Sequence, residues 1–278
     1  MEYKRLIKRS LAGVLFALVI VAGLDLAALS ACAAAPDGAA IIEKSNETYY
    51  YSGKDGRASL KMTITDRAGR VRTREMTLLR LDIEDGGRQR FYVYFHRPAD
   101  IGGMVFMVWK NIKKDDDRWL YIPAIDLVKR VAAKDKRSSF AGSHFTYEDV
   151  SGRATTDDTH EFLREEKLGG RDMYLVKNTP KDAASVEFSY YLSWIDKETY
   201  LPMKGEYFDK GGNSYRVITI LETKEVQGIP TVVKALVEEK GRGKTVVEFK
   251  DVKYNIGLKK NIFTERSLRR PPRRWIKK

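Results

Sequence analysis

The sequence predicts a mainly β protein of about eleven strands in an antiparallel sheet. Apolar and polar residues alternate with a period of two along most of the chain, which is typical of strands with one buried face. Short turns rich in glycine, aspartate and proline separate these segments. The strand segments also follow one another without intervening helices, whereas a parallel sheet needs a crossover between its strands.

One helix is expected before the strands, over residues 37–51. Ile41, Ile42, Ser45 and Tyr49 recur there at spacings of three and four, which places them near one face of a helix. Two glycines between residues 52 and 56 end this segment. The first strands are then expected at residues 59–65 and 71–83.

The second of these strands contains an irregularity. Its apolar positions shift by one residue between Leu78 and Leu79. Such a shift moves side chains to the other face of a strand unless a β-bulge absorbs it. A bulge or a strong bend is therefore expected at this point.

The next strands are apolar at consecutive positions, so neither face is expected to lie in water. They are expected at residues 91–95, 104–109 and 119–122, with a further short strand after Pro123. One face can belong to the core. The other then needs a lid, a partner or a ligand to cover it.

A helical or looped insertion is expected around residues 133–158, and it begins with a basic loop. A hairpin around two glycines is expected at residues 159–178. The remaining strands are expected at residues 186–195, 200–208, 214–226, 231–239 and 244–254, followed by a short C-terminal segment at 261–268.

The first 35 residues read as an export signal. Four bases between residues 4 and 9 precede an apolar run from Leu11 to Leu24, and small residues follow it. The run is shorter than the roughly 20 residues of a membrane-spanning helix. An uncleaved anchor is the alternative. Residues 36–278 are expected to form a single domain.

The only cysteine, Cys32, lies within this signal segment. Residues 29–32 resemble a bacterial lipobox, in which the cysteine becomes the lipidated first residue. Ordinary cleavage at an A-x-A site is favoured slightly, because Asp25 ends the apolar run well before the cysteine. After such cleavage the chain would contain no thiol for a disulfide or for nucleophilic chemistry.

The positive charge of the chain is uneven. The formal net charge is +13, of which residues 1–35 contribute +2 and residues 259–278 contribute +8. This basic C-terminal tail suits an anionic membrane surface or an acidic partner, and a merely solvating tail is the alternative. Because an exported protein meets lipids and envelope proteins, a nucleic-acid partner is not expected.

Five segments together resemble one bacterial family. They are RASLKMTIT (57–65), DRWLYIPA (117–124), FAGSHFTYED (140–149), SWIDKETYLP (193–202) and FTERSLRRP (263–271). In this order they are similar to the outer membrane lipoprotein-sorting proteins, relatives of the periplasmic lipoprotein carrier LolA. The resemblance extends over nearly the whole chain after the signal, although the Arg- and Pro-rich tail is not part of the carrier's pattern.

The resemblance implies a curved, half-open antiparallel β-barrel whose concave face is covered by helices. It implies a periplasmic carrier that binds acyl chains of lipids or lipoproteins in a hydrophobic cavity. A partnership with an inner-membrane exporter of the resistance-nodulation-division (RND) type is also implied. A non-enzymatic adaptor subunit of such an exporter, with a vestigial cavity, is the alternative function. No cofactor is expected.

Candidate ligand-binding residues follow from the doubly apolar strands and from this implied cavity. Large aromatic and methionine side chains suit a cavity that must also release its ligand. The candidates for the cavity lining are Phe91, Tyr94, Met104, Phe106, Trp109, Trp119, Tyr121 and Phe145, although each would also serve as ordinary core. Lys134, Lys136 and Arg137 are candidates for a mobile lid that contacts lipid headgroups.

Catalytic and metal sites are not expected. The three histidines are far apart and lack the spacing of metal ligands. Asp115, Asp116 and Asp117 lack the pattern of a calcium-binding loop. Ser143 and His144 precede two carboxylates, which suggests a lipid-ester hydrolase as a weaker alternative, but no nucleophile elbow is present.

Overall fold

The computed structural model describes residues 35–84 and 86–277. The predicted signal segment up to residue 34, including Cys32, lies outside them. The described residues contain one antiparallel sheet of thirteen strands, with helix α1 (Gly38–Tyr50) ahead of it. The predicted fold class is therefore confirmed, with thirteen strands rather than about eleven.

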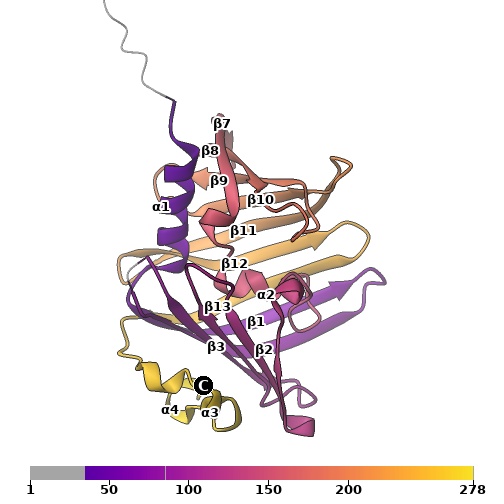
Figure 1. Ribbon diagram of the computed structural model, residues 1–278, viewed down its shortest axis with the longest axis vertical. Helices are drawn as coiled ribbons and strands as arrows, with labels where there is room; N and C mark the ends of the chain where they lie inside the picture. Colours follow the sequence, from indigo (N-terminus) through magenta and orange to yellow (C-terminus); the bar gives the residue numbers. More distant parts are fainter. Residues whose placement is uncertain (1–34, 85, 278) are drawn as a thin grey trace, which may run out of the picture. The chain divides into compact units, whose positions relative to one another are not determined.

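The sheet consists of two consecutive meanders joined in the middle (Figure 1). The first half contains β1 (Asp55–Asp66), β2 (Val71–Asp82), β3 (Gln89–Arg97), β4 (Val105–Lys110), β5 (Asp117–Ile122) and β6 (Leu127–Arg130). The second half contains β7 (Asp158–Leu168), β8 (Arg171–Pro180), β9 (Tyr190–Asp196), β10 (Pro202–Phe208), β11 (Ser214–Val226), β12 (Ile229–Glu239) and β13 (Gly243–Tyr254).

Pairing of β1 with β13 joins the two halves, so that β6 and β7 form the two edges. No ladder connects these edge strands within the described residues, and the sheet curves without closing into a barrel. The result is the half-open barrel that the resemblance implied. Its concave face is left available for other parts of the chain.

Helix α1 lies across part of the concave face (Figure 1). The carboxylate of Asp37 caps it by accepting a hydrogen bond from the amide of Ala39 at 2.9 Å. A Cβ atom on Gly38 would lie 2.8 Å from the carbonyl oxygen of His160 in β7. Glycine at this position therefore allows the helix to approach the sheet closely.

Residues 132–152, which we call the lid segment, also cover the concave face. They contain the 3₁₀ turn η2 (Ala133–Asp135) and the short helix α2 (Tyr147–Ser151). Phe140 is buried and lies 5.4 Å from the ring of Phe106 in β4. The helical or looped lid expected from the sequence is thus present.

The doubly apolar strands are covered on both faces. Phe91 and Val93 of β3 face the concave side, where they pack in one core cluster. Their neighbour Tyr92 belongs to a second cluster on the convex side, together with Val105 and Met107 of β4. Because successive residues of a strand point to opposite faces, each face of β3 and β4 has its own core.

The C-terminal strap, residues 256–277, supplies the cover on the convex side. It consists of η4 (Lys260–Ile262), α3 (Glu265–Arg269) and α4 (Arg273–Ile276). Phe263 and Leu268 are fully buried against the convex core cluster. The strap lies below the sheet in Figure 1.

Hydrogen bonds anchor both ends of the strap. The carboxylate of Asp55 accepts hydrogen bonds from the amides of Ile256, Gly257 and Leu258 at 2.7–3.0 Å. Arg57 donates to the carbonyl oxygens of Trp275 and Lys277, each at 2.9 Å. The basic tail predicted from the sequence is therefore a packed element whose apolar residues point inward and whose lysines and arginines are exposed.

The expected bulge in β2 between Leu78 and Leu79 is not present. The register of β2 with β1 is regular throughout, and its register with β3 shifts only between Glu75 and Met76. Leu78 packs in the concave cluster and Leu79 in the convex one. The apparent shift in the sequence arises because both faces of this strand are buried.

Candidate functional site

A pocket of about 370 Å³ lies on the concave face between α1, the lid segment and the sheet. This volume is within the usual range of small-molecule sites. Strands from both halves of the sheet line it with apolar side chains, among them Leu60, Met76, Phe91, Ile220, Ala235 and Phe249. The pocket therefore offers an apolar wall at the junction of the two meanders.

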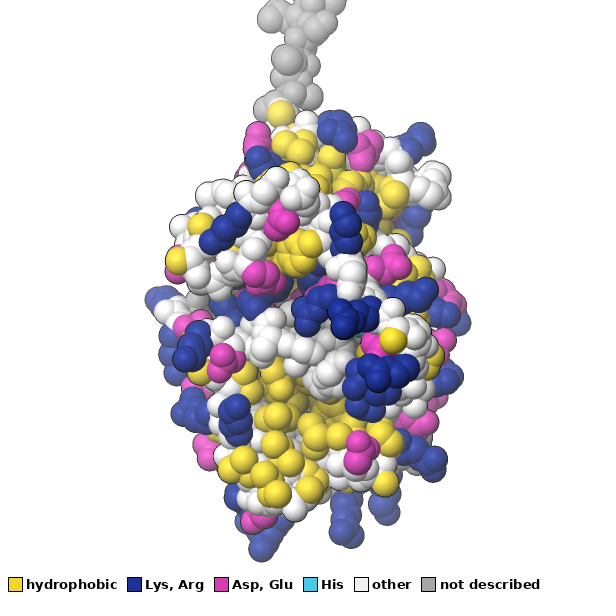
Figure 2. Space-filling view, turned by 90° about the vertical axis from the view of Figure 1, so that its right-hand side faces the viewer, with side chains coloured by type: hydrophobic (Ala, Val, Ile, Leu, Met, Phe, Trp, Pro, Cys, Tyr) yellow, Lys and Arg dark blue, Asp and Glu magenta, His cyan; other side chains and the backbone are white. Residues whose placement is uncertain are grey.

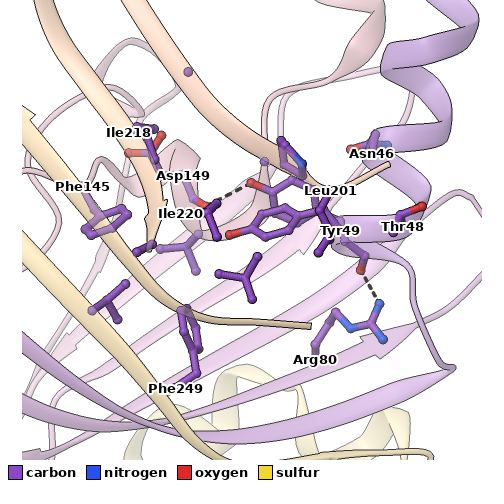
Figure 3. Close-up of a pocket in the computed structure, with 18 of the residues that line it drawn as sticks. Asn46, Thr48, Tyr49, Arg80, Phe145, Asp149, Leu201, Ile218, Ile220 and Phe249 are labelled. Carbon is purple, nitrogen blue, oxygen red and sulfur yellow. Dashed lines mark hydrogen bonds between the residues drawn. The ribbon is translucent and has the colours of Figure 1, made fainter. Parts of the chain in front are cut away.

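Helix α1 provides the opposite wall. Ile42, Ser45 and Tyr49 lie one turn apart on the same side of the helix, and all three line the pocket. Figure 3 shows the ring of Tyr49 extending into the pocket beside Leu201 and Ile220. The helix thus brings hydroxyl groups to a space that is otherwise mainly apolar.

Ion pairs surround the side of the pocket near the lid segment. Arg137 binds Glu148 at 3.1 Å and Glu187 at 2.7 Å, and Arg153 binds Asp158 at 2.8 Å. Burial alone would lower the pKa of Arg137, but its hydrogen bond to Glu187 and the charge of Asp149 raise it above its ordinary value. These arginines are therefore permanently charged and already paired.

Contacts with three strands hold the lid segment in place. Arg216 of β11 forms an ion pair with Asp149, and the His144 ring lies 2.8 Å from the hydroxyl of Thr245 in β13. The amine of Lys110 in β4 donates to the carbonyl oxygen of Ser151 at 2.6 Å. The lid segment is accordingly tied to both halves of the sheet.

The buried Lys110 predicts a dependence of stability on pH. Burial lowers its pKa from 10.5 to about 8, so between these values the unfolded chain binds more protons than the folded chain. The penalty of the buried charge is complete below pH 8 and is relieved as the pH rises. The contribution of Lys110 to the free energy of unfolding should therefore increase from pH 8 towards pH 10, by up to about 3 kcal/mol.

Urea unfolding at pH 7, 8, 9 and 10 would measure this contribution as the difference between the wild type and the Lys110→Met variant. This difference should change in favour of the wild type from pH 8 to pH 10, whereas the difference between the wild type and Lys113→Met, which changes an exposed neighbour, should not depend on pH. An equal increase in the wild type and in Lys110→Met would assign the effect to other groups.

The structure distributes the eight predicted lining residues over several environments. Phe91 and Phe145 line the pocket. Phe106 and Met104 pack beneath the lid segment in the concave core. The remaining four lie in or against the convex core that the strap covers: Tyr94, Trp109, Trp119 and Tyr121. Contact of any of these residues with a ligand stays a prediction.

The three basic residues of the lid segment differ in their surroundings. Lys134 is exposed, whereas the side chains of Lys136 and Arg137 are only 13% and 8% exposed and take part in ion pairs. Their contact with headgroups also stays a prediction. A headgroup would have to compete with carboxylates that Lys136 and Arg137 already bind.

The residues of the hydrolase alternative do not contact one another in a catalytic arrangement. The hydroxyl of Ser143 donates to the carbonyl oxygen of Phe140 at 2.7 Å, and the ring of His144 contacts Thr245. Glu148 and Asp149 are paired with arginines. These contacts do not favour a hydrolytic triad.

The sequence analysis missed the part of the site formed by α1 and β11–β13. The spacing of Ser45 and Tyr49 indicated the buried face of the helix, but burial is equally typical of plain core. Ile220, Ala235 and Phe249 lie in alternating strands that look like an ordinary half-buried sheet. The pairing of β1 with β13 brings these distant segments together.

Comparisons with known proteins agree with this architecture. A family model described as an uncharacterized protein matches residues 87–270. No protein of curated function matches the chain. Many solved structures resemble it.

A DUF1329 family protein from Desulfovibrio piger is 27% identical, with a TM-score of 0.78 over 83% of this chain and 97% of that one. A domain described as an outer membrane lipoprotein-sorting protein, from Vibrio parahaemolyticus, is 26% identical, with a TM-score of 0.77 over 84% and 98%. A LolA superfamily protein from Nitrosomonas europaea shares the fold, at 20% identity and a TM-score of 0.63 over 84% and 99%.

Proposed function

The chain belongs to the LolA-like family of outer membrane lipoprotein-sorting domains, and from this premise we propose that it is a carrier of acyl chains in the cell envelope. The pocket under α1 binds the acyl chain of a lipid or a lipoprotein, and the protein releases it at a membrane or to a partner. The protein acts by binding and transfer and catalyses no reaction. The signal predicted in the first 35 residues directs it to the periplasm.

The observation that carries this proposal is the apolar pocket at the centre of the concave face. Transfer of a 16-carbon chain from water into such a pocket gains up to about 12 kcal/mol, at about 0.8 kcal/mol per methylene group. Loss of freedom on binding reduces this value substantially. The remainder is sufficient for capture, and an imperfect fit allows release.

The surface features support the approach of the protein to a lipid surface. Figure 2 shows basic side chains spread over one face, with apolar side chains gathered on its lower part. Lysines and arginines are attracted to anionic headgroups. Within the described residues, no helix has both the length and the apolar character needed to span a membrane.

Mass spectrometry of organic extracts would test the proposal on protein purified from its native envelope without detergent. We expect a lipid or an acylated peptide in stoichiometric amount. Empty protein that also takes up no acyl probe would contradict the proposal and would favour the alternative of an exporter adaptor.

Filling the pocket should abolish uptake of acyl chains. Ala235 is buried in β12 and lines the pocket, so the Ala235→Trp variant should place its indole in the space of the ligand. We expect the affinity for a fluorescent acyl probe to fall at least about tenfold, because the apolar surface offered to the chain is occupied.

Leu221→Trp is the matched control, since Leu221 is 47% exposed on the neighbouring strand β11. It should bind the probe like the wild type. Unchanged binding by a folded Ala235→Trp variant would place the acyl chain elsewhere in the molecule.

A further inference from the structure

Two hydroxyl groups on α1 have no partner within the pocket. Neither Ser45 nor Tyr49 forms a side-chain hydrogen bond with any other group of the described residues. Ser45 is only 4% exposed, and Figure 3 shows Tyr49 directed into the pocket. Tyr49 is half-buried, and neither hydroxyl oxygen is fully enclosed by protein, so both can reach a molecule in the pocket. Because polar groups in an apolar space are normally hydrogen-bonded, this unpartnered pair on one helix face indicates a place for a polar group of a ligand.

The hydroxyl groups of Ser45 and Tyr49 are neutral, and each can therefore donate a hydrogen bond to a ligand. Burial raises the pKa of Tyr49 to about 12, and the negative charge of Asp149 adds to the effect. The phenol therefore keeps its proton at neutral pH. A carbonyl oxygen can accept a hydrogen bond from it, whereas a carboxylate placed there would lose its hydration and would need a cation to compensate for that loss.

The cations that line the pocket already have other partners. Arg80 pairs with Asp82 at 3.2 Å, and Lys204 lies 2.8 Å from Glu206. Arg137 and Arg153 are paired with carboxylates as described above, and Arg57 is bound to the strap. Among the described basic residues of the lining, only Lys253 has no such contact, and its side chain is exposed to water, which weakens its attraction.

We propose that Ser45 and Tyr49 hydrogen-bond the neutral carbonyl group at the head of a bound acyl chain, so that the pocket accepts acyl esters and amides in preference to free fatty acids. This inference rests on the proposed carrier function and names its ligand class. An ester is the linkage in a membrane lipid, and an amide is the linkage in an N-acylated protein. The two share the carbonyl group that the hydroxyls recognise.

Fluorescence titration with four probes would test the inference at pH 8. The probes are methyl cis-parinarate, N-methyl cis-parinaramide, cis-parinaric acid and the hydrocarbon diphenylhexatriene. We expect the wild type to bind one or both neutral derivatives at least about tenfold more tightly than the acid. The comparison of ester with amide then shows which of the two linkages the hydroxyl groups of Ser45 and Tyr49 bind more tightly.

The Ser45→Ala/Tyr49→Phe double variant should bind the neutral derivatives about 25-fold more weakly, since each of the two lost hydrogen bonds accounts for roughly a fivefold change. Its affinity for diphenylhexatriene should stay within about twofold of the wild type, which also shows that the pocket is intact. Tyr51→Phe is the matched control, because the Tyr51 hydroxyl donates to the carbonyl oxygen of Gly87 at 2.7 Å, outside the pocket. This control should bind all four probes like the wild type.

The outcomes separate this inference from the proposed function. Equal or tighter binding of the acid by the wild type would overturn the inference and leave the carrier function standing. An unchanged preference for neutral derivatives in the double variant would overturn the roles of Ser45 and Tyr49. Failure of the wild type to bind any of the four probes would overturn the carrier function as well.

Discussion

The Arg216→Met variant is expected to lose about 3 kcal/mol or more of unfolding free energy. Arg216 is 1% exposed, and its guanidinium group forms an ion pair with Asp149 and donates to the carbonyl oxygen of His144 at 3.3 Å. Removing one member of a buried ion pair leaves the other charge without its partner, which typically costs about 3–5 kcal/mol. Here the remaining charge would be the carboxylate of Asp149, in the lid segment.

Two further substitutions make this prediction specific. Arg242→Met removes an exposed arginine that pairs with Glu239 at 3.0 Å, and it should cost less than about 1 kcal/mol. The Arg216→Met/Asp149→Asn double variant should recover much of the loss, because no buried charge then lacks a partner. Denaturant unfolding of the four proteins measures these differences. A loss below about 1 kcal/mol for Arg216→Met would show that the pair contributes little.

The ion pair between Arg216 and Asp149 should also control the motion of the lid segment. Asp149 also accepts a hydrogen bond from the amide of Thr146 and so caps α2. Without Arg216, we expect faster amide hydrogen exchange in residues 139–152 than in the strands beneath them. Access to the pocket would then increase while the sheet stays folded.

The fold could be predicted well from the sequence because the patterns that indicate helices, strands and turns are local. The helix was expected at residues 37–51 and is observed at Gly38–Tyr50. The period of two and the turn residues located most strands to within a few positions. One exception is the strand expected at 186–195, which begins only at Tyr190 although Val186 and Phe188 are buried. Burial alone does not show whether an alternating segment is paired.

The site was harder to predict because its parts meet only in the folded chain. Consecutive apolar residues in β3 showed that both faces are covered, but not which cover lies over which face. Phe91 therefore reached the pocket, whereas Tyr94, a candidate on the same grounds, lies on the convex side. The pattern of apolar residues in a single sequence does not show which face of the sheet becomes concave.

Substitutions in the strap are also expected to have a large effect on the free energy of unfolding. Replacing Phe263 or Leu268 by alanine should lower the free energy of unfolding by about 3–5 kcal/mol, since each side chain is at most 1% exposed. The indole of Trp109 donates to the carbonyl oxygen of Phe263 at 2.9 Å, which holds this segment where a cavity could not easily collapse. Thermal or denaturant unfolding would measure the loss.

Leu221→Ala is the control, because Leu221 is 47% exposed and its truncation should change stability by no more than about 0.5 kcal/mol. If the tail were only a basic, solvated extension, Phe263→Ala would behave like this control. The apolar convex faces of β3, β4 and β5 argue against that result, since water would otherwise meet Tyr92, Val105 and Met107 directly. The strap is therefore as much a part of the core as α1, and the basic residues that it carries are held in fixed positions on the surface.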